Sequence, residues 1–320
     1  MKYRRLGRTA LNVSELCLGT MNFGPRTPER ASFAILDAAV DAGINFIDTA
    51  NQYGGHLGVG TTETLLGKWL AKHPDKRQRL VIATKVHEPM SDDINDRGLS
   101  ARHIQMACEA SLERLRVDHI ELYQMHHIDR AAPVEEVALA MDRLIQQGKV
   151  TYLGSSNFPG WAIARSCERA RASGGLGLVA EQSLYNLLER RVELEVIPAC
   201  REYGLGLIPW SPLAGGLLAG RGGDSQRRST DDAEAAMTEK AGQLGAFAEL
   251  CDALGEPMSV VALAWLLHQD TVSATIIGPG TPDQLSGVLG VPDLALSTET
   301  LAQIDAIFPP TGEAPEAYAW

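Results

Sequence analysis

Eight short runs of apolar and β-branched residues recur along the chain, and segments of helical character lie between them. The runs are nearly continuous in apolar character rather than alternating, which indicates strands buried on both faces, as in a parallel sheet. The predicted strands are residues 15–20, 44–49, 80–85, 120–126, 150–156, 176–182, 205–211 and 273–280.

The segments between these runs predict the helices that would cover such a sheet. Three of them are followed by Gly43, Gly148 and Gly204, which is typical of helix C-terminal stops. The predicted helices are residues 28–42, 62–72, 101–115, 134–147, 160–172, 189–203 and 259–268.

This alternation of strand and helix, without a linker, predicts one domain over residues 1–320 with the fold of a (β/α)8 TIM barrel. A doubly wound sheet would normally open with a Gly-rich phosphate turn, whereas the first strand here leads into "GTMNFG". The opening residues contain two short segments around the turn Gly7-Arg8-Thr9. They predict a β-hairpin that closes the bottom of the barrel.

Composition and charge narrow the class of protein. No apolar run approaches the roughly 20 residues that span a bilayer, and the N-terminus lacks the apolar stretch of a signal peptide. We therefore expect a soluble, cytoplasmic protein. The net charge of -11 argues against binding to nucleic acid or an anionic membrane. The five scattered cysteines suggest neither a disulfide framework nor a zinc site.

Three successive predicted strands end in chemically active side chains: Asp48, Lys85 and His126, with Tyr53 on the loop after the second strand. Taken singly, each has an ordinary structural interpretation: Asp48 as a helix cap, Lys85 as a solvated charge, His126 as a core histidine and Tyr53 as a loop aromatic. In a barrel, however, the C-terminal ends of the strands meet at one opening.

Together these side chains suit the reduction of a carbonyl group. A tyrosine titrates near pH ~10, and a neighbouring lysine ammonium would stabilise its phenolate. An aspartate paired with the lysine would keep it charged, and a histidine could donate a hydrogen bond to the substrate oxygen.

From "YRRLGRT" to "DQLSGVL" the chain resembles the aldo-keto reductase superfamily. Asp48, Tyr53, Lys85 and His126 match its catalytic pattern within "FIDTA", "ATK" and "LYQMH". The resemblance implies a barrel that binds NADP(H) without a Rossmann domain and transfers hydride to an aldehyde or ketone. The contexts "HHID" and "SLYNLLER" are similar to actinobacterial members that include reductases of nucleotide-linked keto-deoxysugars.

The resemblance also implies which residues hold the cofactor. Ser156, Asn157 and Gln182 match the residues that hold the nicotinamide carboxamide, and Trp210 matches the stacking aromatic. The long loop of residues 219–235 is expected to lie over the cofactor site. The remaining predicted cofactor contacts are Gly19, Thr20, Met21, Asp48, Ser211, Leu213, Gly215, Gly278, Gly280, Thr281 and Gln284.

One cofactor position departs from the family pattern. Gly280 stands where the family usually carries an arginine or lysine that grips the 2′-phosphate of NADP. Losing that contact should weaken the preference for NADP(H), so that NAD(H) is possible, unless Arg221, Arg227 or Arg228 takes over.

The substrate is expected to be a small carbonyl compound in a pocket lined by Met21, Phe23, Tyr53, His127 and the long loop. Two other functions stay open. One is a cofactor-binding regulatory subunit of the same fold with negligible turnover, as in the barrel subunits of potassium channels. The other is a metal-dependent barrel hydrolase using the run "HHID" and His56.

The metal alternative is weaker, and we predict no metal. Adjacent residues on a strand point to opposite faces, so His126 and His127 are not expected to share an ion. A catalytic zinc also needs three convergent protein ligands. The sequence leaves the oligomeric state and the direction of the reaction open.

Overall fold

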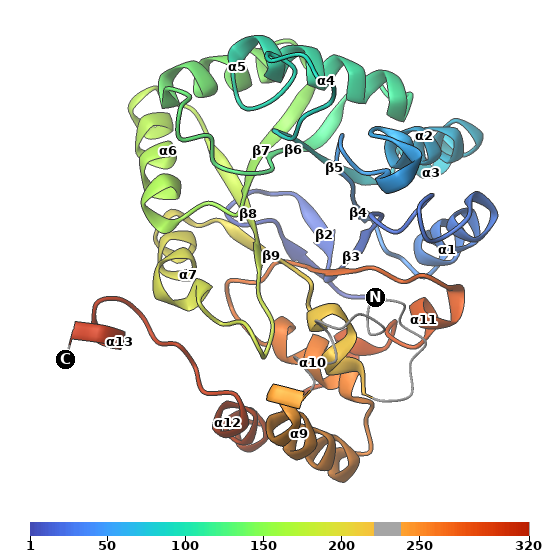
Figure 1. The fold of residues 1–320 in the computed structure, drawn as a ribbon, viewed down its shortest axis with the longest axis vertical. Coiled ribbons are helices and arrows are strands. Elements are labelled where there is room, and N and C mark those ends of the chain that lie inside the picture. Colours follow the sequence, from blue (N-terminus) through green and yellow to red (C-terminus); the bar gives the residue numbers. More distant parts are fainter. Residues whose placement is uncertain (221–237, 320) are drawn as a thin grey trace.

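The computed structural model describes residues 1–220 and 238–319. Eight parallel strands neighbour one another in the order β10-β3-β4-β5-β6-β7-β8-β9 (Figure 1). A bridge between Leu207 and Val272 brings the last strand beside the first, so the sheet curves into a (β/α)8 barrel, as predicted. The strands are β3 (Leu16–Gly19), β4 (Phe46–Asp48), β5 (Val81–Val86), β6 (Ile120–Met125), β7 (Val150–Ser156), β8 (Leu178–Leu184), β9 (Gly206–Trp210) and β10 (Thr275–Ile277).

Helices surround the barrel (Figure 1), and the seven predicted ones are all present, with α7 beginning three residues later than expected. They are α1 (Glu29–Asp41), α2 (Thr61–Lys72), α4 (Ala101–Leu115), α5 (Val134–Gln146), α6 (Gly160–Ala172), α7 (Val192–Tyr203) and α10 (Met258–Leu267). Further short elements are α3 (Pro74–Arg77), α11 (Pro282–Ser286), α12 (Thr298–Ile307), α13 (Glu316–Ala319), and the 3₁₀ turns η1 (Gly55–Leu57), η2 (Ala214–Ala219) and η4 (Val291–Asp293).

Helix α9 (Ala241–Leu254) was not predicted. It contains Gly242 and Gly245, and glycine costs about 1 kcal/mol relative to alanine within a helix, so the segment reads as a poor helix former. Packing outweighs that cost, because Phe247 and Cys251, one turn apart, are both buried against the rest of the core.

The N-terminal hairpin pairs β1 (Tyr3–Arg5) with β2 (Asn12–Ser14) in antiparallel register. Gly7 turns the chain with a φ of +53°, and a Cβ there would lie 2.5 Å from the Val179 carbonyl oxygen. Only glycine satisfies both constraints. Leu6 and Val13 are buried with the side chains of the barrel interior, so the hairpin closes the bottom of the barrel.

Two apolar layers explain why the predicted strands were continuous in character. Leu122, Ala180 and Ile208 face the barrel interior. The neighbouring residue of β6, Tyr123, instead packs in the larger layer between strands and helices. Both faces of each strand are therefore buried away from water.

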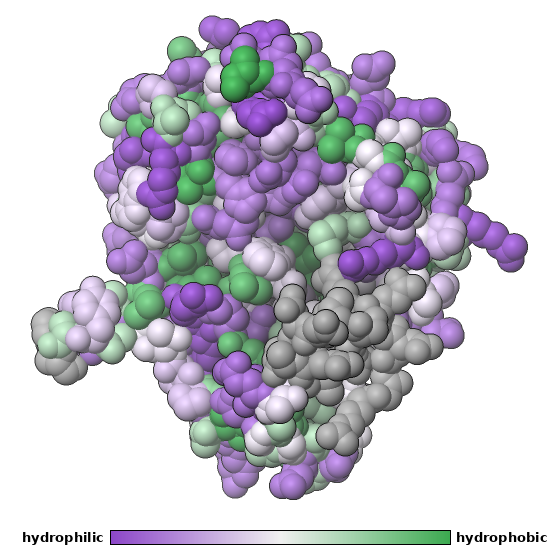
Figure 2. All heavy atoms as spheres, viewed as in Figure 1, coloured by the Kyte–Doolittle hydropathy of each residue, from purple (hydrophilic) through white to green (hydrophobic). Residues whose placement is uncertain are grey.

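Hydrophilic residues cover much of the face seen in Figure 2. Among the helices of the described residues, none by itself has the length and apolar character needed to cross a membrane, although the bent pair α9 and α10 together meets that criterion.

Candidate active site

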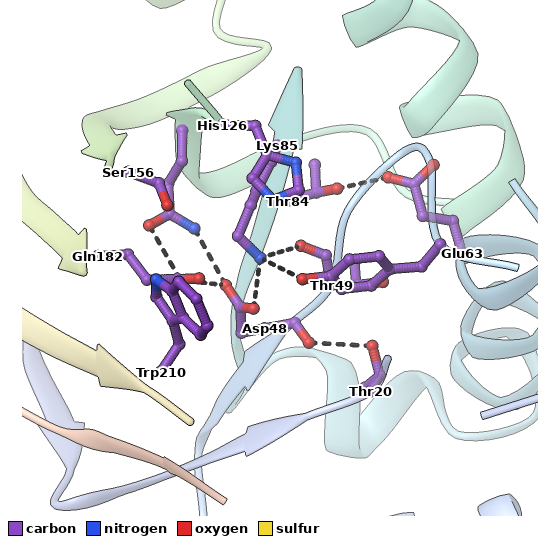
Figure 3. Close-up of polar contacts among 12 residues, drawn as sticks. Thr20, Asp48, Thr49, Glu63, Thr84, Lys85, His126, Ser156, Gln182 and Trp210 are labelled. Carbon is purple, nitrogen blue, oxygen red and sulfur yellow. Dashed lines mark hydrogen bonds and ion pairs between the residues drawn. The ribbon is translucent and has the colours of Figure 1, made fainter. Parts of the chain in front are cut away.

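Lys85 is the centre of the candidate site. Its ammonium donates hydrogen bonds to Asp48 Oδ1 at 2.5 Å, to the Thr49 carbonyl oxygen at 2.9 Å and to the Tyr53 hydroxyl at 3.3 Å (Figure 3). Strand β5 alternates here, so Lys85 points into the barrel while Thr84 points outward and donates to the buried Glu63. The fold thus brings together an acid, a cation and a phenol that are far apart in the sequence.

Asp48 is held on both carboxylate oxygens. Oδ1 accepts from Lys85, while Oδ2 accepts from Gln124 Nε2 at 3.0 Å and Gln182 Nε2 at 2.8 Å. Its backbone carbonyl accepts from the Thr20 hydroxyl at 2.9 Å. Gln124 was not predicted as a site residue. It lies on β6 directly opposite Lys85 of β5, one residue before the end of that strand, so its place near the C-terminal end of a predicted strand was the available signal.

The charge of Lys85 is set by opposing effects. Its side chain is fully buried, and burial lowers its pKa, but Asp48 and Tyr53 raise it by more, so the net pKa is above the usual value. Lys85 is therefore an ammonium at neutral pH. A buried cation of this kind needs its carboxylate partner.

His126 follows β6, and its backbone N–H is bonded to Val86. Only 8% of the residue is exposed, and this burial, with the charge of Lys85 and the neighbouring imidazoles, lowers its pKa to about 2. The imidazole is thus neutral. Its ring meets the Tyr53 ring edge to face at 6.1 Å, so both groups border the same space.

The structure corrects one expectation about the adjacent histidine. The rings of His126 and His127 do not point to opposite faces but stack at 5.0 Å with an angle of 8° between their planes. The reason is that β6 ends at Met125, so strand alternation no longer applies. Within residues 1–220 and 238–319, no group of three or more His, Cys, Asp or Glu side chains could hold a metal ion.

The residues predicted for the nicotinamide carboxamide lie beside this cluster. Asn157 has a φ of 57° and donates to the Ser156 hydroxyl at 3.0 Å and the His126 carbonyl at 3.2 Å. Its Oδ1 accepts from Trp210 Nε1 at 3.0 Å. Figure 3 shows Ser156, Gln182 and Trp210 on the same side of Asp48. Ends of β7, β8 and β9 thus meet at one side of the opening.

A second carboxylate, Glu181, bonds to residues on either side of this turn. It was not predicted as a site residue. It is fully buried and accepts hydrogen bonds from the Phe158 backbone N–H at 3.1 Å, from Ser183 Oγ at 2.7 Å and from Ser155 Oγ. Burial raises its pKa to about 7, although these hydrogen bonds lower it. Its signal in the sequence was an acid within an apolar run, with Ser183 two residues later.

The predicted pyrophosphate segment is a tight turn after β9. Ser211 and Gly215 have φ values of 50° and 67°, and the Ser211 carbonyl accepts from Asn186 Nδ2 at 3.0 Å. Leu213 lies between them, before η2. Of the predicted long loop of residues 219–235, all beyond residue 220 lies outside the described residues, as do Arg221, Arg227 and Arg228.

Polar groups of the predicted phosphate segment make local contacts. Gln284 Oε1 accepts from the Gly280 N–H at 2.7 Å, and Thr281 Oγ1 caps α11 by accepting from the Gln284 N–H at 3.2 Å. The Gly278 carbonyl accepts from Asn22 Nδ2 at 3.0 Å. A Cβ at Gly280 would meet nothing closer than 3.4 Å, so a side chain fits there.

The site residues predicted at and after the first strand differ in their exposure. Gly19 is confined, because a Cβ would lie 2.6 Å from Ile276 Cγ2, and Thr20 is bonded to Asp48. Met21 is 46% exposed and so is accessible to a ligand. Phe23, expected in the substrate pocket, is instead fully buried in the core. Phe23 therefore does not form an exposed wall of a pocket.

Comparisons with known proteins show the family to which the chain belongs. A profile described as the aldo/keto reductase family matches residues 15–308. The chain is 49% identical to a Bacillus subtilis protein named uncharacterized oxidoreductase YrpG, over 100% of both chains. It is 31% identical to norsolorinic acid reductase B of Dothistroma septosporum, covering 97% of this chain and 82% of that protein. It is 32% identical to versiconal hemiacetal acetate reductase of Aspergillus parasiticus, covering 97% and 98%.

Proposed function

Because this chain belongs to the aldo/keto reductase family, we propose that it reduces an aldehyde or ketone to an alcohol with NADP(H) or NAD(H), and that Tyr53 is the general acid. The observation that carries the proposal is the position of Lys85 Nζ, 3.3 Å from the Tyr53 hydroxyl and 2.5 Å from Asp48. The names of two relatives, both reductases, support the same class of reaction.

In this proposal the Tyr53 hydroxyl gives its proton to the carbonyl oxygen as negative charge develops there. The phenolate that remains lies beside the Lys85 ammonium, whose charge stabilises it. Asp48 keeps that ammonium charged and fixed within the barrel. A neutral phenol is thereby made a usable acid near neutral pH.

His126 acts as a neutral hydrogen-bond donor to the same oxygen. Its low pKa keeps it uncharged over the whole working range of pH, so its role is to orient the carbonyl and not to supply the proton. The T-shaped contact with Tyr53 places both donors at one opening.

The residues present fit a nicotinamide cofactor, since Ser156, Asn157 and Gln182 offer amide and hydroxyl groups next to Asp48 and the half-buried Trp210 offers an aromatic face. When bound, the reduced nicotinamide supplies the hydride. Three segments would hold the remainder of the cofactor. They are the turn at Ser211, Leu213 and Gly215, the group Gly19, Thr20 and Met21 after the first strand, and the residues from Gly278 to Gln284.

Two measurements test the proposal. Titration of NADPH and of NADH against tryptophan fluorescence should show binding of at least one cofactor, and a panel of aldehydes, ketones and keto-sugars should show turnover. Tyr53→Phe should remove the proton donor and lower kcat by about 100-fold or more while cofactor affinity stays the same. Failure of both cofactors to bind would contradict the proposal. Binding without turnover of any carbonyl would instead identify a regulatory subunit.

A further inference from the structure

The orientation of the His126 ring is not set by the kind of hydrogen bond that usually fixes such a histidine. A histidine with a directed N–H is normally held through its second ring nitrogen by a carbonyl or carboxylate. Here the second nitrogen, Nδ1, is buried and has no hydrogen-bond partner among the described residues. Another contact must therefore determine the angle of the ring.

The face of the ring is covered by His127. The two imidazoles lie 5.0 Å apart and within 8° of parallel. A flat neighbour restricts rotation of the ring about its χ2 torsion, which is otherwise broad. His127 can restrict the His126 ring only if His127 is itself fixed, and its side chain is 44% exposed.

Glu88, on the loop after β5, holds His127 in place. Its Oε1 lies 3.2 Å from His127 Nε2 and 3.3 Å from His87 Nδ1, so one carboxylate oxygen meets two imidazoles. The rings of His87 and His127 also meet edge to face at 5.4 Å. His127 is thus confined on its edge by Glu88 and His87 and on its face by His126.

The charge state of this contact follows from its surroundings. Burial lowers the pKa of His127 and the neighbouring His87 lowers it further, while Glu88 raises it by less, so the ring is neutral near pH 7. The contact between Glu88 Oε1 and His127 Nε2 at 3.2 Å therefore joins a carboxylate to an uncharged ring. The other groups that face the stacked pair are Lys85 and Tyr53 on the barrel side.

We propose that Glu88 is a positioning residue for the reaction: it holds His127 flat against His126 and so fixes the angle at which His126 directs its N–H to the substrate oxygen. This inference rests on the proposed reductase function, in which His126 orients the carbonyl. Glu88 acts through His127 and contacts neither cofactor nor substrate.

Four variants separate geometry from charge. Glu88→Ala removes the acceptor and should lower kcat about tenfold, whereas Glu88→Gln keeps an acceptor oxygen and should recover most of it. His127→Ala should lower kcat similarly, and His127→Phe, which keeps a flat ring against His126, should recover part of the loss. In the two Glu88 variants, the KM of the carbonyl and the affinity for cofactor should change by no more than about twofold.

The control is Glu109→Ala, which removes a surface carboxylate on α4 that is paired with Lys149 and should leave kcat unchanged. A rise in KM with unchanged kcat in Glu88→Ala would overturn the proposal, because it would mean that Glu88 contacts the substrate. Equal loss in Glu88→Gln and Glu88→Ala would also overturn it, because charge and not geometry would then matter.

A spectroscopic measurement separates this inference from the proposed function. With ¹³C-labelled histidine, the Hε1 signal of His126 should shift in Glu88→Ala and in His127→Ala, because ring-current shielding by the stacked neighbour is lost. An unchanged His126 signal in both would overturn the positioning role, whether or not the protein reduces carbonyls. Tyr53→Phe tests the reductase function without disturbing this stack.

Discussion

Glutamine in place of Glu181 should remove a large part of the dependence of stability on pH. The native pKa of about 7 exceeds the usual value of 4.5, so the native state binds this proton more tightly than the unfolded chain does. The associated stability is fully present below pH 4.5 and is lost as pH rises through about 7. At 1.36 kcal/mol per pKa unit, the full loss is about 3 kcal/mol.

The Glu181→Gln variant has no proton to lose, and a glutamine can still accept from the Phe158 N–H while donating to a serine hydroxyl. Relative to the parent protein, the variant should therefore gain about 2 to 3 kcal/mol in the free energy of unfolding between pH 5 and pH 8. Urea unfolding at both pH values measures this difference, provided that the m-value is unchanged.

The control for this experiment is Glu168→Gln, because the side chain of Glu168 is 58% exposed and its carboxylate stays in water. A difference between parent and Glu181→Gln that is the same at pH 5 and pH 8 would refute the reasoning. That result would mean that the hydrogen bonds from Ser155, Ser183 and Phe158 offset burial completely.

Three further changes test other parts of the structure. Asp48→Asn leaves the Lys85 ammonium buried without its counter-charge and should lower the free energy of unfolding at pH 7 by about 3 kcal/mol, as measured with urea. Gly67→Ala places a Cβ 2.0 Å from a backbone oxygen of α4 and should lower it by about 1 to 3 kcal/mol, whereas Gly242→Ala, with open space around it, should cost nothing. Gly280→Arg restores a cation beside the predicted 2′-phosphate site and should tighten NADPH relative to NADH by about tenfold in fluorescence titrations; equal affinities would contradict that placement.

Much of the architecture follows from the sequence because the signals are local and redundant. The pattern of apolar and polar residues predicts the eight buried strands and most of the helices. Asp48, Lys85 and His126 are predicted to converge because the C-terminal ends of barrel strands meet at one opening. Helix α9 escaped prediction because its stability comes from tertiary packing of Phe247 and Cys251, which outweighs the propensity of its glycines.

The supporting side chains were harder to predict, because their partners are distant in sequence. Glu88 meets His127, and Glu181 meets Ser155 and Phe158, only after the strands are aligned. Polar groups near a ligand site are also ambiguous, since a hydroxyl such as that of Thr281 can cap its own helix or contact a ligand.

The way in which Asp48 is held has a consequence for how this protein can change in evolution. One carboxylate contacts Lys85 on the side of the proposed proton donor and Gln182 on the side of the predicted nicotinamide site, and it also accepts from Gln124. A substitution there is pleiotropic, since it alters both halves of the opening at once. Variation in pH response or cofactor choice should therefore accumulate at positions that touch one half only, such as Gly280, and an allele that changes Asp48 should need compensating changes on several strands.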